Sequence, residues 1–431
     1  MRQPIKCVTQ FYWTVLRNIY SIDRKIVKDI RMSGLKTVKI GDICEQINGV
    51  SYKPSDVYDS LTENSTVLLR ANNIFEDELN FDELVFVDKK RVSENQYMKK
   101  GDILICASSG SKHLVGKAAC LSEDKELTFG AFCKVLRPKT VNSDFLKHYF
   151  FSPAYRTEIS RLSEGVNINN IKAADLGNLA ILLPTESEQN KIAKQLDKCI
   201  KIINNQKRTL EKYDTLIKSR FIEMFGDPVN NPMNWEIKPM GELLSLLTDF
   251  SSNGSYKTLD SNVIMYDEPN YALMIRTTDL ESGDFINNVK WVDEKAYNLL
   301  SKSKVFGKEI IMNKIGSAGK VYLMPELNRP VTLGRNAFLF RYKENINSVY
   351  IYFLLTSEYG QNEIKPYIRG AVTKTITKDD ARKIRIPVPS ITLQNNFENF
   401  VHQIDKSKFA MQKSLEKTEI LYKSLMQEYF G

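Results

Sequence analysis

The last seventeen residues of the chain, Leu415–Gly431, repeat an internal stretch, Leu210–Gly226, at a distance of 205 residues. The two stretches read LEKTEILYKSLMQEYFG and LEKYDTLIKSRFIEMFG and are identical at nine of seventeen positions. A period of this length is several times longer than that of a solenoid, so it indicates that a domain-sized unit occurs twice. We therefore expect the chain to fold as two similar halves.

Further pairs of segments recur in the same order along the chain. GDILIC from Gly101 recurs as GKEIIM from Gly307, and SSGS ending at Ser111 recurs as KIGS ending at Ser317. The 431 residues thus hold two copies, each long enough to bury its own core.

Each copy contains short β-branched and apolar runs separated by Gly, Asn, Asp and Ser, a pattern typical of strands and turns. The runs are TVLLR, LVFVD, DILIC and AILLP in the first copy and ALMIR, VKWVD, EIIM, AFLFRY and IRIPVP in the second. Each copy also has a helical segment, DFLKHYFFSPAYRTEI or VYIYFLLTSEYGQNEI. The mixture predicts an α/β (mixed α+β) domain with a twisted, mixed sheet in each copy.

After Pro184 and Pro389, apolar residues recur at steps of four and three. The predicted seam consists of Ile192, Leu196, Cys199, Ile203, Leu210, Tyr213, Ile217 and Met224, and of Phe397, Val401, Ile404, Met411, Leu415, Tyr422, Leu425 and Tyr429. Its gaps are Gln206, Arg220, Lys408 and Thr418. A sustained 3.5-residue period predicts a coiled coil, whereas a helix lying on its own domain would need a wider apolar stripe. We expect the two helices to pair with each other in antiparallel orientation.

The expected organisation has six parts. They are an N-terminal extension (1–32), a first globular domain (33–184), a first long helix (185–225), a linker (226–236), a second globular domain (237–389) and a second long helix (390–431). The segment before Met32 has no counterpart in the second copy, so it is either an extension or lies upstream of the natural start.

Composition restricts the partners and the compartment. There are 61 basic and 52 acidic residues, a net charge of +9 that suits a polyanionic partner. Six cysteines without CxxC spacing and only three histidines argue against a zinc site or a disulfide framework, and favour the cytoplasm. No run of eighteen apolar residues occurs, so no membrane span is expected.

No catalytic motif is recognisable. IGSAGKV resembles a phosphate-binding loop, but Lys314 stands at the first glycine position and Val321 follows Lys320, so its glycines are expected to shape a turn. Only one carboxylate of the pair Asp379-Asp380 recurs in the first copy, as Asp175, where it is expected to buttress a turn. The sequence predicts neither a catalytic residue nor a metal site.

The segments VKIGDIC, ILICASSG, IIMNKIGSAGK, ILLPTESEQNKIA, IPVPSITLQNNF and MFGDPVNNPMNW, in this order, resemble those of the specificity subunit of Type I restriction-modification enzymes. The resemblance covers residues 33–431. It implies that each globular domain is a target recognition domain for one half of a split double-stranded DNA sequence. It also implies that the coiled coil spaces the domains and docks two methylation subunits. Those and the restriction subunits would carry S-adenosylmethionine, ATP and Mg; this chain would carry no cofactor and no catalysis.

Residue type alone suggests which side chains contact DNA, because Arg and Lys suit phosphates or guanine and Asn suits adenine. The candidates are Ser109, Ser111, Lys112, Lys117, Asn167 and Asn169 in the first copy, and Lys314, Ser317, Lys320, Arg369 and Lys374 in the second. Arg70 and Arg276 recur within strand-like runs and are expected to be structural.

Three alternatives remain open from the sequence. The chain could serve a Type II-like methyltransferase or endonuclease with a different catalytic partner. It could be a protein scaffold built on the coiled coil, or a nuclease with an unrecognised metal site.

Overall fold

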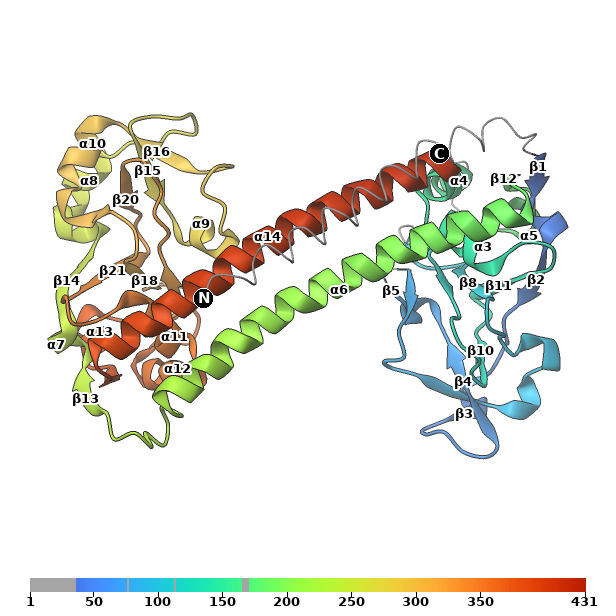
Figure 1. The fold of residues 1–431 in the computed structure, drawn as a ribbon, viewed down its shortest axis with the longest axis horizontal. Coiled ribbons are helices and arrows are strands. Elements are labelled where there is room, and N and C mark those ends of the chain that lie inside the picture. The colour runs from blue at the N-terminus through green and yellow to red at the C-terminus, as the bar shows by residue number, and fades with distance from the viewer. Residues whose placement is uncertain (1–35, 76, 112–113, 165–169) are drawn as a thin grey trace, which may run out of the picture. The chain divides into compact units, whose positions relative to one another are not determined.

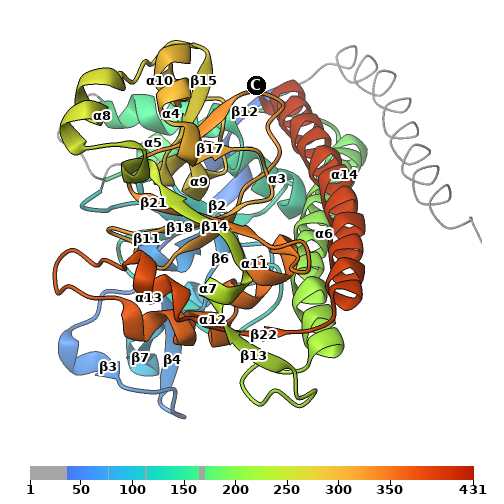
Figure 2. The same ribbon diagram turned by 90° about the vertical axis from the view of Figure 1, so that its left-hand side faces the viewer.

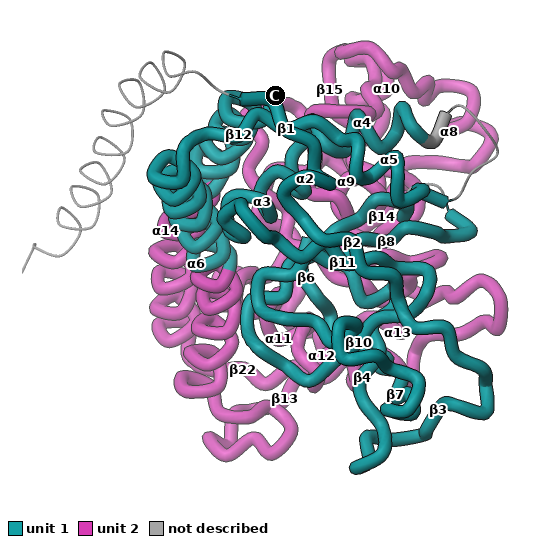
Figure 3. The backbone as a smooth tube through the Cα atoms, turned by 90° about the vertical axis from the view of Figure 1, so that its right-hand side faces the viewer, with its two compact units in different colours: residues 1–207, 413–431 teal, residues 208–412 magenta. Residues whose placement is uncertain are grey.

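The computed structural model describes residues 36–75, 77–111, 114–164 and 170–431. It divides the chain into two compact units: unit 1 comprises Met1–Lys207 with Lys413–Gly431, and unit 2 comprises Arg208–Gln412 (Figure 3). Each unit thus contains one globular part and a stretch of both long helices. The expectation for residues 1–31 lies outside the described residues.

Unit 1 is built on two four-stranded sheets (Figure 1). The first is antiparallel, in the order β2 (Cys44–Asn48), β11 (Cys133–Pro138), β8 (Ile103–Cys106) and β9 (Ala118–Cys120). The second has the order β10 (Leu127–Phe129), β4 (Ser65–Leu69), β7 (Val85–Asp88) and β3 (Val57–Tyr58). Two short pairs join β1 (Lys36–Lys39) to β12 (Ala180–Leu183) and β5 (Ile74–Phe75) to β6 (Glu78–Leu79). Its shorter helices are α2 (Ile40–Ile43), α3 (Ser143–Phe150), α4 (Pro153–Glu164) and α5 (Ala173–Gly177).

Strand β8 explains why the core strands read as unbroken apolar runs. Ile103 and Ile105 pack in the core that contains the helices, whereas Leu104 and Cys106 pack in the core shared with the second sheet. Successive side chains of a strand point to opposite faces, so a strand covered on both faces must be apolar throughout. The single mixed sheet that we expected is thus two sheets packed in layers, in which β4 pairs with β10 in parallel and the other described strand pairs are antiparallel.

Unit 2 repeats this plan with one difference in the second sheet. Its first sheet has the order β14 (Leu244–Asp249), β21 (Ala337–Tyr342), β18 (Ile310–Asn313) and β19 (Val321–Leu323). Its second has the order β16 (Lys290–Val292), β15 (Ala272–Ile275), β20 (Val331–Leu333) and β17 (Lys304–Val305), with β15 parallel to β20. The fourth strand therefore adds beside the parallel partner in unit 2 but beside the antiparallel partner in unit 1. The strand pair β13 (Glu236–Pro239) with β22 (Arg385–Val388) matches β1 with β12.

The shorter helices of unit 2 include counterparts of the four in unit 1. The unit 2 helices are α7 (Met240–Leu243), α8 (Tyr256–Asn262), α9 (Thr277–Ser282), α10 (Glu294–Leu299), α11 (Ser348–Thr356), α12 (Glu358–Ile364) and α13 (Lys378–Arg382), of which α8, α9 and α10 are additional. The two predicted helical segments each form two helices, α3 with α4 and α11 with α12.

Buried glutamines attach the long helices α6 (Glu186–Phe225) and α14 (Ile391–Phe430) to the globular parts. Gln189 accepts a hydrogen bond from the backbone N–H of Asn142 (2.9 Å) and donates one to the carbonyl of Pro184 (2.8 Å). The matching residues in unit 2 are Gln394, Asn347 and Pro389. The start of each helix is thus fixed in the same way in both units.

Within each unit the two long helices run antiparallel. In unit 1, Gln195 accepts from the Tyr429 hydroxyl (2.9 Å) and Gln206 donates to Ser414 Oγ (2.9 Å), so the partner's number falls as the residue number rises. In unit 2, Lys408 pairs with Asp214 at 2.6 Å, while Phe221 contacts the ring of Phe397 at a centroid distance of 5.4 Å. The predicted antiparallel coiled coil is confirmed.

Every predicted seam position is buried or half-buried, and two of the four predicted gaps are buried as well. Among the predicted seam residues, those fully buried are Ile192, Leu196, Cys199, Ile203, Ile217, Phe397, Val401 and Leu425, while Leu210, Ile404 and Leu415 are half-buried. Gln206 and Thr418, which we counted as gaps, are buried too, and both are hydrogen-bonded. Gln206 donates to the Ser414 hydroxyl of the other helix, and Thr418 donates to the Ser414 carbonyl of its own helix. The C-terminal ends of the helices also join a domain core, α6 through Phe221 and Phe225 in unit 2 and α14 through Leu421 and Met426 in unit 1, so each packs there on the globular part that it does not follow in sequence.

Candidate nucleic-acid interface

Several strands of each unit end at one edge, where backbone hydrogen bonds join their loops. In unit 1 the N–H of Gly130, after β10, donates to the carbonyl of Leu69, at the end of β4 (2.9 Å). The N–H of Ala107, after β8, donates to the carbonyl of Phe132 (2.9 Å). A Cβ on Gly49 would lie 2.1 Å from the carbonyl oxygen of Gly130, so this close approach requires glycine. We call this edge the loop edge of the unit.

The predicted candidate loops meet at this edge in both units. In unit 1, Ser108 forms an isolated β-bridge with Asn170, and Ile171 donates to the carbonyl of Ala107 (2.7 Å). In unit 2, Ile315 bridges Thr375 in the same way. The loop after the third core strand and the loop before the last short helix thus lie side by side, although they are about 60 residues apart in sequence.

The candidate residues of unit 1 occupy the first of these loops. Ser109 is half-buried and its hydroxyl accepts the N–H of Ser111 at 3.2 Å. Lys117 is half-buried, and its carbonyl accepts the N–H of Cys106 (2.9 Å). Lys112, Asn167 and Asn169 lie outside the described residues.

Sequence inspection missed an open cleft of roughly 890 Å³ at the loop edge of unit 1. Its lining combines the apolar residues Val50, Tyr52, Val57, Val85 and Phe132 with the polar residues Arg70, Asn72, Ser108 and Ser109. The Phe132 side chain is 71% exposed. The matching residue of unit 2 is Asn336, also exposed, whose carbonyl accepts the N–H of Lys314 as that of Phe132 accepts the N–H of Ala107. An aromatic residue in a loop gives no periodic signal, so only the fold reveals this position.

The candidate residues of unit 2 fall into two groups. Ser317 and Lys374 are exposed, as are Lys320, which is paired with Glu281, and Arg369, which is 71% exposed and lies 3.3 Å from Asp380. Lys314, by contrast, is only 14% exposed and is turned to a carboxylate. The glycines of IGSAGKV do shape a turn, since Gly316 and Gly319 have φ of 80° and 85°.

Arg70 and Arg276 each donate a hydrogen bond to a backbone carbonyl of their own unit. The guanidinium of Arg70 donates to the carbonyl of Glu83 at 3.2 Å, and that of Arg276 donates to the carbonyl of Asn288. Asp380 also buttresses a turn as predicted: it accepts the Thr377 hydroxyl at 2.7 Å, and this bond, aided by nearby cations, lowers its pKa.

The carboxylate that holds Lys314 is Asp249, at the end of β14. Asp249 lies 2.7 Å from the ammonium of Lys314 and 2.7 Å from that of Lys378, the first residue of α13. The Ser252 hydroxyl donates to the same carboxylate at 2.6 Å. Burial opposes ionisation of Asp249, but these hydrogen bonds outweigh it and lower its pKa to about 2. We call Asp249, Lys314, Lys378 and Ser252 the ion cluster; β14, β18 and α13, which carry it or lead to it, can be followed in Figure 2.

Among the described residues of unit 1, uncharged side chains occupy the three charged positions of the ion cluster. The strand pairings place Asn48 where unit 2 has Asp249, and Ala107 where it has Lys314. Ala173 begins α5 as Lys378 begins α13. The two loop edges therefore share a backbone but differ in the side chains they carry: in unit 1, Asn48 accepts a hydrogen bond from the ammonium of Lys134 (2.5 Å).

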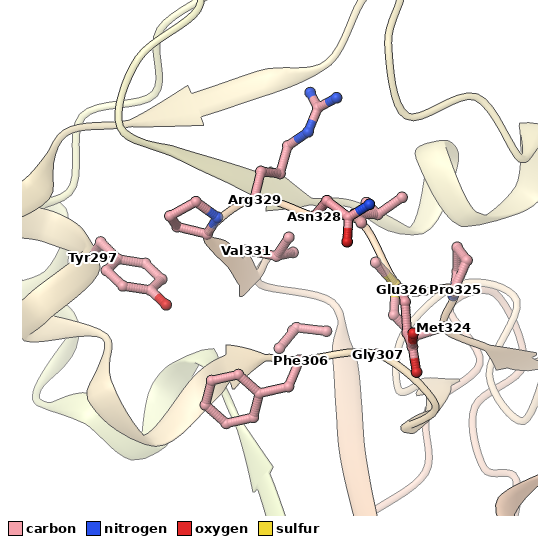
Figure 4. Close-up of a pocket in the computed structure, with 12 residues that line it drawn as sticks. Tyr297, Phe306, Gly307, Met324, Pro325, Glu326, Asn328, Arg329 and Val331 are labelled. Atoms are coloured by element: carbon pink, nitrogen blue, oxygen red, sulfur yellow. The ribbon is translucent and has the colours of Figure 1, made fainter.

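A hollow of unit 2, roughly 240 Å³ in volume, lies at the ends of its strands that are opposite the loop edge (Figure 4). Tyr297, Phe306 and Arg329 are among its lining residues. Gly307 precedes β18 and Val331 opens β20, whereas the loop edge follows both strands. This hollow is therefore not part of the loop edge.

The described residues contain neither a cluster of metal-ligating side chains nor a membrane-spanning helix. Across residues 36–75, 77–111, 114–164 and 170–431, no group of three or more His, Cys, Asp or Glu side chains is placed to hold a metal ion. No helix in that same part of the chain has both the length and the apolar content to cross a membrane.

Comparison with known proteins gives a consistent result. Residues 32–212 and 232–421 each match the family of the Type I restriction modification DNA specificity domain. The specificity subunit of the Type I restriction enzyme EcoKI from Escherichia coli K12 is 36% identical over 234 residues, which are 52% of this chain and 50% of that protein. The StySPI specificity subunit from Salmonella potsdam is 38% identical over 186 residues, 43% of this chain and 40% of that protein. The chain thus spans half or less of the length of these two curated relatives.

A solved structure shares the fold. The crystal structure of the Type I restriction-modification S subunit from M. genitalium superposes with a TM-score of 0.55 at 16% identity, covering 92% of this chain and 96% of that one. Identity at this level bears on the fold alone.

Proposed function

The chain belongs to the Type I restriction modification DNA specificity family, and from this premise we propose that it is the DNA-recognition subunit of a Type I restriction-modification complex. Unit 1 reads one half of a split DNA target and unit 2 reads the other half. The observation that carries the proposal is the double occurrence of the family domain, with the same loop edge built in each copy.

The chemistry of the loop edges supports a DNA partner. Those edges carry Ser, Lys, Arg and Asn side chains, which suit phosphates and base edges. The net charge of +9 adds a sequence-independent attraction to the DNA backbone. The same features would serve a Type II-like assembly, in which only the catalytic partner differs.

The partners and cofactors form part of the proposal. Two methylation subunits dock on the coiled coil and carry S-adenosylmethionine, and restriction subunits supply the ATP- and Mg-dependent steps. This chain contributes the address and no catalysis. Its site of action is the cytoplasm, where the chromosome and the partner subunits lie.

Mapping methylated adenines across a genome tests the proposal, in cells that carry the methylation subunit with and without this chain. We expect one split motif to be methylated only when the chain is present. Methylation that does not depend on the chain would refute the proposal. DNA cutting by the purified chain with magnesium or manganese would support the nuclease alternative instead, and a complex without salt-dependent DNA binding would support the scaffold alternative.

A further inference from the structure

The ion cluster carries an uncompensated positive charge at the loop edge of unit 2. Lys314 and Lys378 contribute two positive charges and Asp249 one negative charge, which leaves a net charge of +1 at neutral pH. The three side chains are 14%, 28% and 8% exposed. Of the two lysines, Lys378 therefore has the more accessible positive charge.

Lys378 keeps a hydrogen-bond donor for a ligand. An ammonium group has three N–H donors. Among the described residues, Lys378 donates to Asp249 Oδ1 and Ser252 Oγ, each at 2.7 Å. Its third donor and its 28% exposure allow one further acceptor to bind.

The cluster also orders this ammonium before any ligand arrives. A lysine side chain loses up to about 2 kcal/mol of conformational entropy when it is fixed in one rotamer. Asp249 and Ser252 have already fixed Lys378, so a ligand that binds it does not bear this cost again. Preorganisation of this kind favours a fixed anionic partner over a passing counterion.

The position of the cluster selects the partner. Ile376, two residues before Lys378, donates its N–H to the carbonyl of Lys314 (3.1 Å), and Ile315 bridges Thr375. The cluster therefore lies directly beneath the two loops that carry the exposed Lys374, Arg369 and Ser317. An acceptor that reaches Lys378 there belongs to the molecule that the loops bind.

We propose that Lys378, positioned by Asp249 and with Lys314 beside it, contacts one backbone phosphate of the DNA half-site read by unit 2. This inference rests on the proposed function of the loop edge. In unit 1 the matching positions hold Asn48, Ala107 and Ala173, and the ammonium that bonds Asn48 belongs to Lys134 of β11.

The salt dependence of DNA binding tests this contact. The probe is a duplex with the methylated target, bound by the full chain in complex with its methylation subunit. Each phosphate contact adds roughly 0.9 to the slope of log affinity against log salt concentration. For Lys378→Met we therefore expect a slope smaller by about 0.9, so that between 50 and 200 mM salt the variant loses about 3.5-fold less affinity than the wild type. The methylated motif should stay the same, because a phosphate contact carries no sequence information.

Lys238→Met is the matched control. Lys238 also lies in unit 2, is 35% exposed and pairs with Glu236 at 3.0 Å, but it lies in β13, at the other end of β14 from Asp249. Its slope should equal that of the wild type. Lys378→Arg, which keeps the charge, should keep the wild-type slope and provides a second folded variant.

The possible results are distinct. A wild-type complex without salt-dependent DNA binding would refute the proposed function itself. Salt-dependent wild-type binding with an unchanged slope in Lys378→Met would leave that function standing and overturn the phosphate contact. A slope in Lys378→Arg as low as that of Lys378→Met would also overturn it, because the effect would then come from structure and not from charge.

Discussion

In units 1 and 2, an acidic residue forms an ion pair with the equivalent arginine of the first sheet, yet the loop edges carry different side chains. In unit 1, Arg137 of β11 bonds Asp102 at 2.7 Å, and in unit 2, Arg341 of β21 bonds Glu309 at 3.1 Å. At the loop edge, unit 1 has a cleft around the exposed Phe132, and unit 2 has the ion cluster. The comparison teaches that the two units share the ion pair that stabilises the first sheet but differ in the side chains that face the partner.

The largest effect on stability should come from breaking the arginine–carboxylate ion pair that both units share. Arg137→Met and Arg341→Met each leave a buried carboxylate without its cation, because Asp102 is 1% and Glu309 is 4% exposed. We expect each variant to lose about 3 kcal/mol of unfolding free energy in its own unit. Hydrogen exchange of amides in each unit measures this. Equal losses support the shared framework, and a loss confined to one unit would break the comparison.

Asp249→Asn should have a smaller effect on stability, and only in unit 2. The native pKa of about 2 lies below the ordinary value of 3.8, so ionised Asp249 stabilises unit 2 above pH 4 and loses this contribution as the pH falls through 2. We expect a loss of about 2 kcal/mol at pH 7 that shrinks toward zero near pH 2. Unfolding measured across this pH range tests the prediction.

Asn48→Ala in unit 1 is the matched change. Asn48 accepts a hydrogen bond from Lys134 at 2.5 Å on an exposed surface, so its loss should be below about 1 kcal/mol and independent of acid pH. A pH-independent loss in Asp249→Asn would show that the ion cluster contributes nothing through charge.

Substitution of the matching exposed residues Phe132 and Asn336 should have a smaller effect, which concerns DNA binding and not stability. An apolar ring suits a thymine methyl group, whereas an amide suits adenine. We expect Phe132→Ala and Asn336→Ala each to weaken binding by about 1 kcal/mol, roughly fivefold, and each to relax one position in a different half-site. Binding to duplexes with single base-pair changes measures this; relaxation in the same half-site by both variants would contradict it.

Removal of residues 1–31 should have the smallest effect. Both family matches begin at or after residue 32, and the segment has no counterpart in the second copy. A chain that starts at Met32 is expected to be as soluble as the full chain and to direct the same methylation. Loss of soluble protein would show that the apolar side chains of this segment complete a core.

The internal repeat made much of the fold predictable, because each strand-like run or apolar stripe could be recognised in two copies. DILIC and EIIM each read as buried strands, and the two long apolar stripes each read as a helix of a pair. The layering into two sheets could not be read in this way, since a strand of four to six residues does not reveal which sheet covers its second face. Gln206 looked like a gap because a buried amide bonded to Ser414 has no hydrophobic signature.

The candidate site was predictable only where the two copies agree. The loops that meet at the loop edge recur, so they were found. The ion cluster joins residues 65 and 129 positions apart, and its counterparts in unit 1 are uncharged, so comparison of the copies could not reveal it. Features that make one unit differ from the other are by nature absent from a repeat signal.

Exchange of one unit tests the central claim most directly. Residues 37–184 are replaced by the corresponding segment of a family member with a different target, and methylated adenines are mapped genome-wide. We predict a split motif in which one half has changed and the other half keeps its sequence. A motif that changes in both halves, or in neither, would contradict the claim that units 1 and 2 read DNA independently.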